Sequence, residues 1–436
     1  MTELATIHPE PNIIPRSGHG ISRANISPNA LKVLYRLNNA GYAAYLVGGG
    51  VRDLSLGREP KDFDVATDAR PEEVKRLFRN CRLIGRRFRL AHVYFGCEII
   101  EVATFRALHE ADGEAGDNAR VLQDGRLLSD NVFGSIDEDA RRRDFTVNAL
   151  YYRIGDFTLV DYVGGMADLQ HGVLRLIGDA EVRYREDPVR MLRAARFAVK
   201  LGFRMHAETA GPIPRMAHLL SHIPAARLFE EVLKLFLTGM GLQVFECLRH
   251  YGLFGCLFPD TEEVLAQDEL GSALTFLSRA LANTDGRIAE GKPVTPAFLF
   301  AALLWPPISR RLANLGQNTA EPIQVIHETA GEVLERQLRT VTIPKRFSIP
   351  MREIWSLQPR FERRTGKRAL RLLSHPRFRA AYDFMLLRAE AGEAEAELAH
   401  WWKELQLSAV AQRVEMTGSR RRSGRRRHRR KRNDTA

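Results

Sequence analysis

The chain has 436 residues, 44% of them hydrophobic, which is typical of a soluble globular protein with roughly two to four domains. Its four cysteines form no CxxC pair and its N-terminus shows no basic segment followed by an apolar one, which argues against a zinc site and a secretory signal. No apolar run reaches membrane-spanning length, so we expect a cytoplasmic protein without a transmembrane segment.

The positive charge is concentrated at the C-terminal end. The formal net charge is +12, and residues 420–436 hold ten Lys and Arg against one Asp, which gives +9 and leaves +3 for residues 1–419. The Arg-rich stretch has no apolar residue to bury, so we expect residues 413–436 to form a disordered basic tail. Such an asymmetry predicts a polyanionic partner.

The chain is expected to begin with a flexible leader, because residues 1–26 are rich in proline and polar side chains. Ser27 then caps a helix that has Pro28 in its first turn, and the apolar stripe of this helix starts at Leu31. The helix should open the first folded domain.

A glycine-rich turn follows the first predicted strand, Tyr45–Val47. Gly48, Gly49 and Gly50 carry no Cβ, so the backbone can approach a bulky anion at this point. The helix that follows would direct its N-terminal amides toward the same anion. The turn therefore predicts a phosphate-binding site.

Two carboxylates lie on one face of the second predicted strand, Asp62–Val65. Side chains of a strand alternate between faces, so Asp62 and Asp64 point the same way. They repel each other unless a cation lies beside them, and oxygen-only ligands favour Mg²⁺. A lone glycine triplet is usually a turn and a lone Asp-x-Asp is usually a solvated strand edge, but both within 17 residues indicate nucleotide chemistry.

GGGVRD at 48–53, followed by DFD at 62–64, resembles the signature of the class II nucleotidyltransferases, the family of bacterial poly(A) polymerases and CCA-adding tRNA enzymes. The resemblance implies an α+β fold: a polymerase β-like nucleotidyltransferase head with a mixed sheet, then an all-α neck, body and leg region and a disordered basic tail. It also implies that Gly48, Gly49 and Arg52 bind the triphosphate of ATP.

The expected domains between leader and tail follow the same family. Residues 27–160 would be the catalytic head, 161–228 the neck that selects the nucleotide, 229–341 a helical body, and 342–412 a helical basic region that binds RNA. The resemblance is supported by good motifs over roughly residues 27–260 and is weak beyond them.

Glu101, in the predicted strand Glu98–Phe105, is a candidate third carboxylate. Alternation places it opposite Ile100 and Val102, where it either serves as a third metal ligand or lies solvated on the sheet face. The resemblance instead implies that Asp144 is the third catalytic carboxylate. The two residues remain alternatives.

The segment Arg141–Leu150, RRRDFTVNAL, matches the family's second motif. Because the arginines abut an apolar segment, at least one should be held near the core by an anion, either Asp144 or a bound phosphate. The resemblance implies that Arg143 contacts the nucleotide.

A helix is predicted to begin at Asp187 and to place Arg190 and Arg193 on one face. Like charges there are unfavourable unless an anion or a base lies between them, and pairing with Glu186 or Glu181 is the alternative. The sequence EDPVRMLR resembles the family's nucleotide-selecting motif, which implies that Asp187 and Arg190 read the base and that Arg193 contacts the nucleotide.

Beyond about residue 228 the apolar spacing is helical throughout. A basic segment at 345–371 interleaves its charges with Phe347, Trp355 and Phe361, a pattern typical of single-stranded RNA binding by phosphate contact and stacking. The alternative is that these aromatic rings are simply helix core.

The segment LIGRRFRLAHV at 83–93 resembles the one that marks bacterial poly(A) polymerases, as does the Arg-rich C-terminus. The resemblance predicts a polynucleotide adenylyltransferase that adds AMP from ATP to RNA 3′ ends without a template and so promotes RNA turnover. Its chemistry would be two-metal attack of the 3′-hydroxyl on the α-phosphate with release of pyrophosphate.

Mg²⁺ held by Asp62 and Asp64 is the expected cofactor. RNA 3′ ends, single-stranded or structured, ATP, and RNA-degradation or RNA-chaperone proteins are the expected partners. A CCA-adding enzyme and a catalytically inactive RNA-binding protein are the alternatives.

Overall fold

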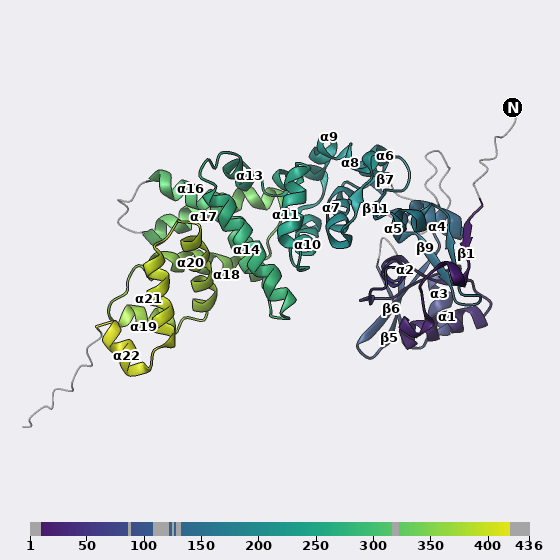
Figure 1. Ribbon diagram of the computed structural model, residues 1–436, viewed down its shortest axis with the longest axis horizontal. Coiled ribbons are helices and arrows are strands. Elements are labelled where there is room, and N and C mark those ends of the chain that lie inside the picture. Colours follow the sequence, from purple (N-terminus) through teal and green to yellow (C-terminus); the bar gives the residue numbers. More distant parts are fainter. Residues whose placement is uncertain are drawn as a thin grey trace, which may run out of the picture. The chain divides into compact units, whose positions relative to one another are not determined.

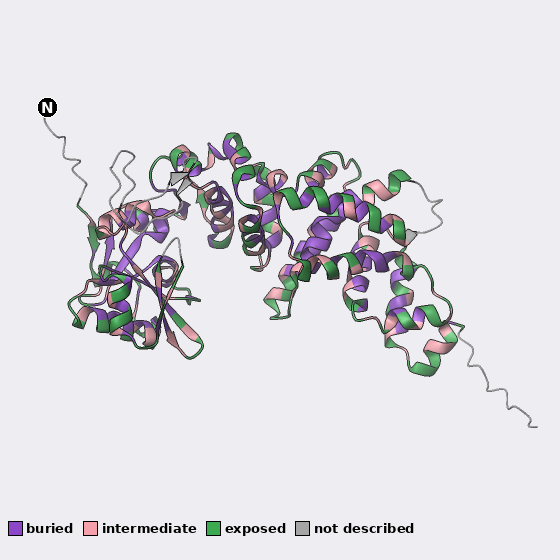
Figure 2. Cartoon of the chain, turned by 180° about the vertical axis from the view of Figure 1, so that it is seen from behind, coloured by how far each residue is buried: buried purple, intermediate pink, exposed green. Residues whose placement is uncertain are grey.

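The computed structural model describes residues 10–85, 89–107, 122–123, 126–127, 132–315 and 322–418. The chain divides into two compact units, Met1–Ile223 with Glu246–Leu253 and Pro224–Phe245 with Phe254–Ala436. Buried residues lie along the strands of the first unit and along the inner sides of the helices in both units (Figure 2).

The described part of the first unit is built on an eight-stranded mixed sheet (Figure 1). Its strands are β1 Asn12–Ile14, β2 Ala44–Val47, β3 Asp64–Thr67, β4 Cys81–Ile84, β5 Leu90–Phe95, β6 Glu98–Thr104, β9 Leu150–Arg153 and β10 Thr158–Asp161. The strand order is β1-β10-β9-β2-β3-β6-β5-β4, with β3 and β6 parallel and the other neighbours antiparallel. The two short pairs are β7 Leu122–Gln123 with β8 Arg126–Leu127, and β11 Val173–Leu174 with β12 Arg204–Met205.

The described helices of the first unit are α1 Pro28–Asn39, α2 Gly48–Ser55, α3 Pro71–Leu77, α4 Ile136–Arg142, α5 Gly165–Gln170, α6 Ala180–Glu186, α7 Val189–Leu201, α8 Ala207–Ala210 and α9 Ile213–Met216. Helix α1 is capped as expected, because the Ser27 hydroxyl accepts from the amides of Asn29 and Ala30. Helices α1 and α3 pack on the central strands β3 and β6 and their neighbours.

The second unit is helical in all its described elements. Its helices, together with α11 and α12 at the division between the units, are α10 Ala225–Phe236, α11 Gly241–His250, α12 Leu253–Leu257, α13 Pro259–Ala266, α14 Ser272–Ala289, α15 Pro296–Leu303, α16 Trp305–Leu315, α17 Pro322–Thr340, α18 Lys345–Phe361, α19 Gly366–Leu373, α20 Phe378–Glu390, α21 Ala396–Leu407 and α22 Val410–Met416. None of the described helices combines the length and apolar character needed to cross a bilayer.

The predicted fold class is confirmed: a mixed sheet with helices is followed by an all-helical region. The structure differs from the prediction of a flexible leader over 1–26, because β1 pairs with β10 at the sheet edge. Ile14 and Ile21 are buried there. The structure also differs from the prediction of a disordered tail over 413–436, because helix α22 continues to Met416. Residues 419–436 of that predicted tail lie outside the described residues.

Candidate active site

The chain turns directly from β2 into α2 at Gly48. This residue has a φ of +70°, in the left-handed region that L side chains rarely adopt. A Cβ built there would lie 3.6 Å from Asp64 Oδ2 and 3.6 Å from Arg143 Nη1. The missing side chain therefore leaves open the space between a carboxylate and a guanidinium.

The other two glycines of the turn allow α2 to pack closely. A Cβ at Gly50 would lie 3.3 Å from the backbone oxygen of Asp62, and one at Gly49 would lie 3.5 Å from Arg52 Nη2. Helix α2 thus lies against the segment that carries Asp62. The sequence predicted this aspartate inside the second strand, but β3 begins two residues later.

Asp64 and Glu101 are register partners on the parallel strands β3 and β6. Burial, and then the charge of Glu101, raise the pKa of Asp64 to about 6, against the opposing charge of Arg143. Glu101 is half-exposed, and its Oε1 lies 3.3 Å from Nε2 of His92. Asp62, just before the strand, is exposed and also raises the pKa of Asp64. The carboxylates around Asp64 therefore carry more negative charge than the nearby Arg143 offsets.

The donor set fits Mg²⁺ shared with a substrate. No group of three or more His, Cys, Asp or Glu side chains in the described part of the chain is placed to hold a metal by itself. Mg²⁺ is commonly bound by one or two carboxylates together with substrate phosphates and water. Asp62 and Asp64 match that pattern, and a cation beside Asp64 would relieve the unfavourable burial of its charge.

Arg143 follows α4 directly, and its guanidinium is bonded to Asp139 of that helix and to Tyr151 of β9. Its Nη1 is the atom that approaches Gly48. Burial alone would lower the pKa of Arg143, but Tyr151 and Asp139 outweigh burial and raise it. Arg143 is therefore a permanent cation beside the open turn.

Both carboxylate oxygens of Asp144 accept hydrogen bonds from other groups of the protein. Oδ2 accepts from Nε of Arg193 at 3.0 Å and from its Nη2, while Oδ1 accepts from the Phe145 amide at 2.8 Å and from Nδ2 of Asn148 at 3.2 Å. Burial opposes ionisation, but Arg193 and these hydrogen bonds outweigh it and lower the pKa of Asp144. Asp144 thus joins the RRRDFTVNAL segment to α7.

Arg52 is buried, only 2% exposed, and bonded within the head. Its Nη1 donates to Oδ1 of Asn148 at 2.6 Å and its Nε to Oδ1 of Asp53 at 2.8 Å. Arg52 therefore holds the end of the glycine turn against the Asn148 segment.

Arg190 forms an ion pair with Glu186, which is the alternative that the sequence left open for this basic helix face. Its Nη1 donates to Oε2 of Glu186 at 2.9 Å and to the backbone oxygen of Arg183 at 2.8 Å. Asp187 is half-buried at the junction of α6 and α7, where its Oδ1 accepts from the Val189 amide at 3.3 Å.

Sequence reasoning missed the residues that hold the site in place. Asp139 lies in α4, four residues before Arg143, a spacing that favours ion pairs on a helix and was available as a signal. Tyr151 belongs to an apolar strand segment, so the sequence pattern predicts only that its side chain packs in the core. Arg183 was not considered, although Nη2 of this buried side chain donates to the backbone oxygens of Arg142 and Arg143.

In the second unit, the aromatic residues predicted to interleave with basic charges are largely core. Trp355 and Phe361 are fully buried, and the Trp355 indole donates to the backbone oxygen of Ala301. Phe347 stacks on Phe229, with ring centroids 5.9 Å apart. The exposed basic side chains of this segment are Lys345, Arg346, Arg352, Arg360, Arg363, Lys367, Arg368 and Arg371.

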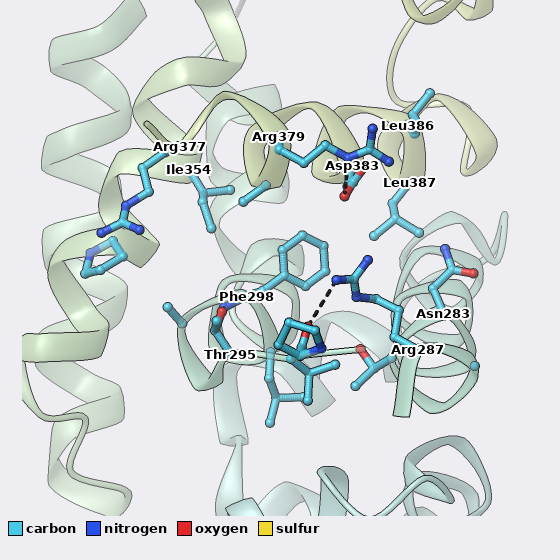
Figure 3. Close-up of a pocket in the computed structure, with 18 of the residues that line it drawn as sticks. Asn283, Arg287, Thr295, Phe298, Ile354, Arg377, Arg379, Asp383, Leu386 and Leu387 are labelled. Carbon is cyan, nitrogen blue, oxygen red and sulfur yellow. Dashed lines mark hydrogen bonds and ion pairs between the residues drawn. The ribbon is translucent and has the colours of Figure 1, made fainter. Parts of the chain in front are cut away.

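A cavity of about 600 Å³ lies among α14, α15, α18 and α20 (Figure 3). Phe298 and Ile354 are among its apolar walls, and Arg379 forms an ion pair with Asp383 at 3.1 Å. The charged residues that line it are Arg287, Arg377, Arg379, Glu290, Asp383 and Glu390. Because three arginines face three acids, the cavity is not a basic site for phosphate.

Paired carboxylates beside a glycine turn, on a mixed sheet followed by helices, define a nucleotidyltransferase. Three family descriptions match the chain: "Poly A polymerase head domain" at residues 44–175, "Probable RNA and SrmB-binding site of polymerase A" at 202–265, and "Polymerase A arginine-rich C-terminus" at 318–434.

Curated relatives and solved structures agree with this class. Poly(A) polymerase I of Escherichia coli O6:H1 is 55% identical over 411 residues, 93% of this chain and 88% of that protein. The CCA-adding enzyme of Lactobacillus gasseri is 38% identical over 51% of this chain and 54% of its own length. The crystal structure of the Bacillus stearothermophilus CCA-adding enzyme in complex with CTP has a TM-score of 0.57 at 24% identity, covering 91% of this chain and 89% of that one, which shows the shared fold.

The chain belongs to the bacterial poly(A) polymerase family. The prediction of a template-independent polynucleotide adenylyltransferase is thereby confirmed, and CCA-adding enzymes are more distant relatives.

Proposed function

We propose that this poly(A) polymerase binds ATP with Mg²⁺ at the Gly48 turn and that Asp62 and Asp64 hold the metal. The observation that carries the proposal is the open space at Gly48, with Asp64 Oδ2 on one side and Arg143 Nη1 on the other. A triphosphate bound there would find carboxylates for its metal and a guanidinium for its oxygens.

In the proposed reaction, the 3′-hydroxyl of the RNA attacks the α-phosphate of ATP, a phosphodiester bond forms, and pyrophosphate leaves. When bound, Mg²⁺ supplies the Lewis acidity that lowers the pKa of the hydroxyl and offsets charge on the phosphates. The chain's own residues would position the reactants: Asp62 and Asp64 would hold the metal, and Arg143 would hold phosphate oxygens.

Glu101 is the better candidate for the third carboxylate. It is the register partner of Asp64 and contributes directly to the raised pKa of that residue. Asp144 already accepts hydrogen bonds on both oxygens from Arg193, Asn148 and a backbone amide. We therefore propose that Glu101 acts beside the metals and that Asp144 orients Arg193.

Selection of ATP is proposed to depend on the junction of α6 and α7. Asp187 and Arg190 would read the adenine edge, with Glu186 setting the direction of the Arg190 guanidinium. Arg193 would contact the nucleotide from a position fixed by Asp144. Arg52 would act by supporting the turn, because its guanidinium is bonded inside the protein.

RNA is proposed to be held through its phosphates rather than by stacking. The exposed basic side chains on α18 and α19 can contact a backbone of any sequence, whereas Trp355 and Phe361 are buried. The Arg-rich stretch at 420–432 would add to this interaction. RNA-degradation or RNA-chaperone proteins stay predicted partners, and the cytoplasm stays the predicted location.

The test supplies the purified protein and Mg²⁺ with each of the four nucleotides singly, on a generic RNA and on a tRNA that lacks its 3′ end. We expect ATP alone to be incorporated, as long homopolymers on both primers. Addition of two C and one A to the tRNA, followed by arrest, would show a CCA-adding enzyme instead. RNA binding without incorporation of any nucleotide would show an inactive member of the family.

A further inference from the structure

We infer that Asp139 and Tyr151 are positioning residues that aim the Arg143 guanidinium at the triphosphate of ATP, an inference that rests on the proposed role of Arg143. Nothing in the sequence motifs assigns either residue. The three side chains come from α4, from the turn that follows it, and from β9.

The three side chains are all hydrogen-bonded to one another. Asp139 Oδ2 accepts from Arg143 Nε at 3.2 Å, from Arg143 Nη2 at 3.1 Å and from the Tyr151 hydroxyl at 2.7 Å. The Tyr151 oxygen in turn accepts from Arg143 Nε at 2.8 Å. Two of the three guanidinium nitrogens are thereby fixed. The third, Nη1, makes a longer hydrogen bond of 3.4 Å to the backbone oxygen of Asn148 and is the nitrogen that approaches Gly48.

Both supporting residues are themselves immobilised. Asp139 is 8% exposed, and its Oδ1 accepts from the Arg106 amide at 3.3 Å. The Tyr151 ring is fully buried, lies 5.1 Å from the Arg143 guanidinium carbon, and meets Tyr45 and Tyr162 edge-on. A guanidinium held in this way reaches phosphate with little rotational freedom left to lose.

The geometry favours positioning over a purely structural ion pair. An i,i+4 Asp–Arg pair needs no phenol. Here Tyr151 adds a second acceptor for Arg143 Nε from a different element and holds the Asp139 carboxylate through its own hydroxyl. Burial raises the pKa of Tyr151 well above the usual value, so that the hydroxyl stays a donor to Asp139. The resulting direction of Nη1 is toward the only glycine of the turn with a positive φ.

The first experiment compares Tyr151→Phe with Tyr152→Phe in the full-length enzyme. Tyr152 is the next residue of β9, is equally buried, and its hydroxyl has no partner among the described residues, so it is a matched control. Loss of a hydrogen bond to a charged group should raise KM for ATP about tenfold in Tyr151→Phe with little change in kcat. Tyr152→Phe should leave both unchanged.

The second experiment is a double-mutant cycle with Arg143→Lys, scored by KM for ATP and by binding of a fluorescent ATP analogue. If Tyr151 acts through Arg143, Tyr151→Phe should add little further loss in the Arg143→Lys background, whereas independent structural effects would multiply. Asp139→Asn should behave as Tyr151→Phe does, since it keeps the shape and removes the charge.

The outcomes separate this inference from the function on which it rests. If Arg143→Lys leaves ATP binding unchanged, the proposed contact of Arg143 with the triphosphate is wrong, and the positioning role is wrong with it. If Arg143→Lys weakens ATP binding but Tyr151→Phe does not, or if the two effects multiply, only the positioning role is overturned. A Tyr151→Phe variant that loses thermal stability while keeping KM for ATP would likewise overturn it.

Discussion

Asp64→Asn should abolish AMP incorporation and, at the same time, stabilise the metal-free fold. The substitution keeps the size of the side chain and removes a partly buried charge that has Glu101 as its register partner. Losing the metal-assisted stabilisation of charge should cost several kcal/mol in the activation barrier, hence a rate loss on the order of a thousandfold or more.

The size of the stabilisation follows from the pKa of Asp64, which is raised from 3.8 to about 6. Each pKa unit is worth about 1.4 kcal/mol, so the ionised carboxylate costs the metal-free fold up to about 3 kcal/mol at neutral pH. Because the folded pKa lies above the unfolded one, this cost is fully present above about pH 6 and disappears as the pH falls toward 3.8. Asparagine does not incur it at any pH.

The assay is thermal unfolding in EDTA at pH 7.5, together with incorporation of radiolabelled ATP into an RNA primer. Wild type should gain stability on addition of Mg²⁺ by mass action, and the variant should not. Asp68→Asn is the control, because Asp68 is exposed just after β3 and accepts from the Ala43 amide, as an asparagine can. Near-wild-type incorporation would refute the metal assignment, and an unchanged or lower melting temperature in EDTA would refute the charge-burial argument.

Three further predictions concern the carboxylates, the turn and the tail. Glu101→Gln should raise the Mg²⁺ concentration needed for half-maximal rate more than Asp144→Asn does; a larger shift from Asp144→Asn would make that residue the third metal carboxylate. Gly48→Ala should weaken ATP binding and lower the free energy of unfolding by about 1 kcal/mol or more. Gly57→Ala, at a φ of +69° in open space, should lower the free energy of unfolding through backbone strain but leave ATP binding unchanged. Equal ATP affinity in both variants would contradict the proposed site. Truncation after Gly418 should weaken primer binding and, if half of the ten Lys and Arg engage phosphates, flatten its salt dependence by about 3 to 4 in slope; an unchanged slope would assign the tail to an acidic protein partner.

The parts of the site that lie close together in sequence were predictable. The glycine triplet and the Asp-x-Asp pair lie within 17 residues of each other, and alternation predicted that Glu101 points away from the buried Ile100 and Val102. That Glu101 is the register partner of Asp64 follows from the strand pairing, which alternation does not give. Local signals also predicted the cap of α1. The start of β3 was misjudged by two residues, because periodicity does not define where hydrogen-bonded pairing begins.

Contacts between distant segments were not predictable from local patterns. Strand β1 exists because the short apolar segment at Ile13 and Ile14 finds an open sheet edge at β10, far along the chain. The pairing of Asp144 with Arg193 spans 49 residues and carries no periodic signal. Family resemblance assigned Asp144 to catalysis without indicating this partner.

One buried guanidinium links the two ends of the proposed nucleotide site. Nη2 of Arg183 donates to the backbone oxygens of Arg142 and Arg143, and its Nη1 donates to Glu186, which also accepts from Arg190. Burial and the charge of Arg190 lower the pKa of Arg183 to about 10, still high enough to keep it charged at neutral pH. The cost of burying that charge is offset only while both the carbonyls and Glu186 are in place. The residue proposed to hold the phosphates and the residue proposed to read the base are therefore attached to the same rigid support, so that a correctly read base and a correctly held triphosphate occur in one arrangement of the chain.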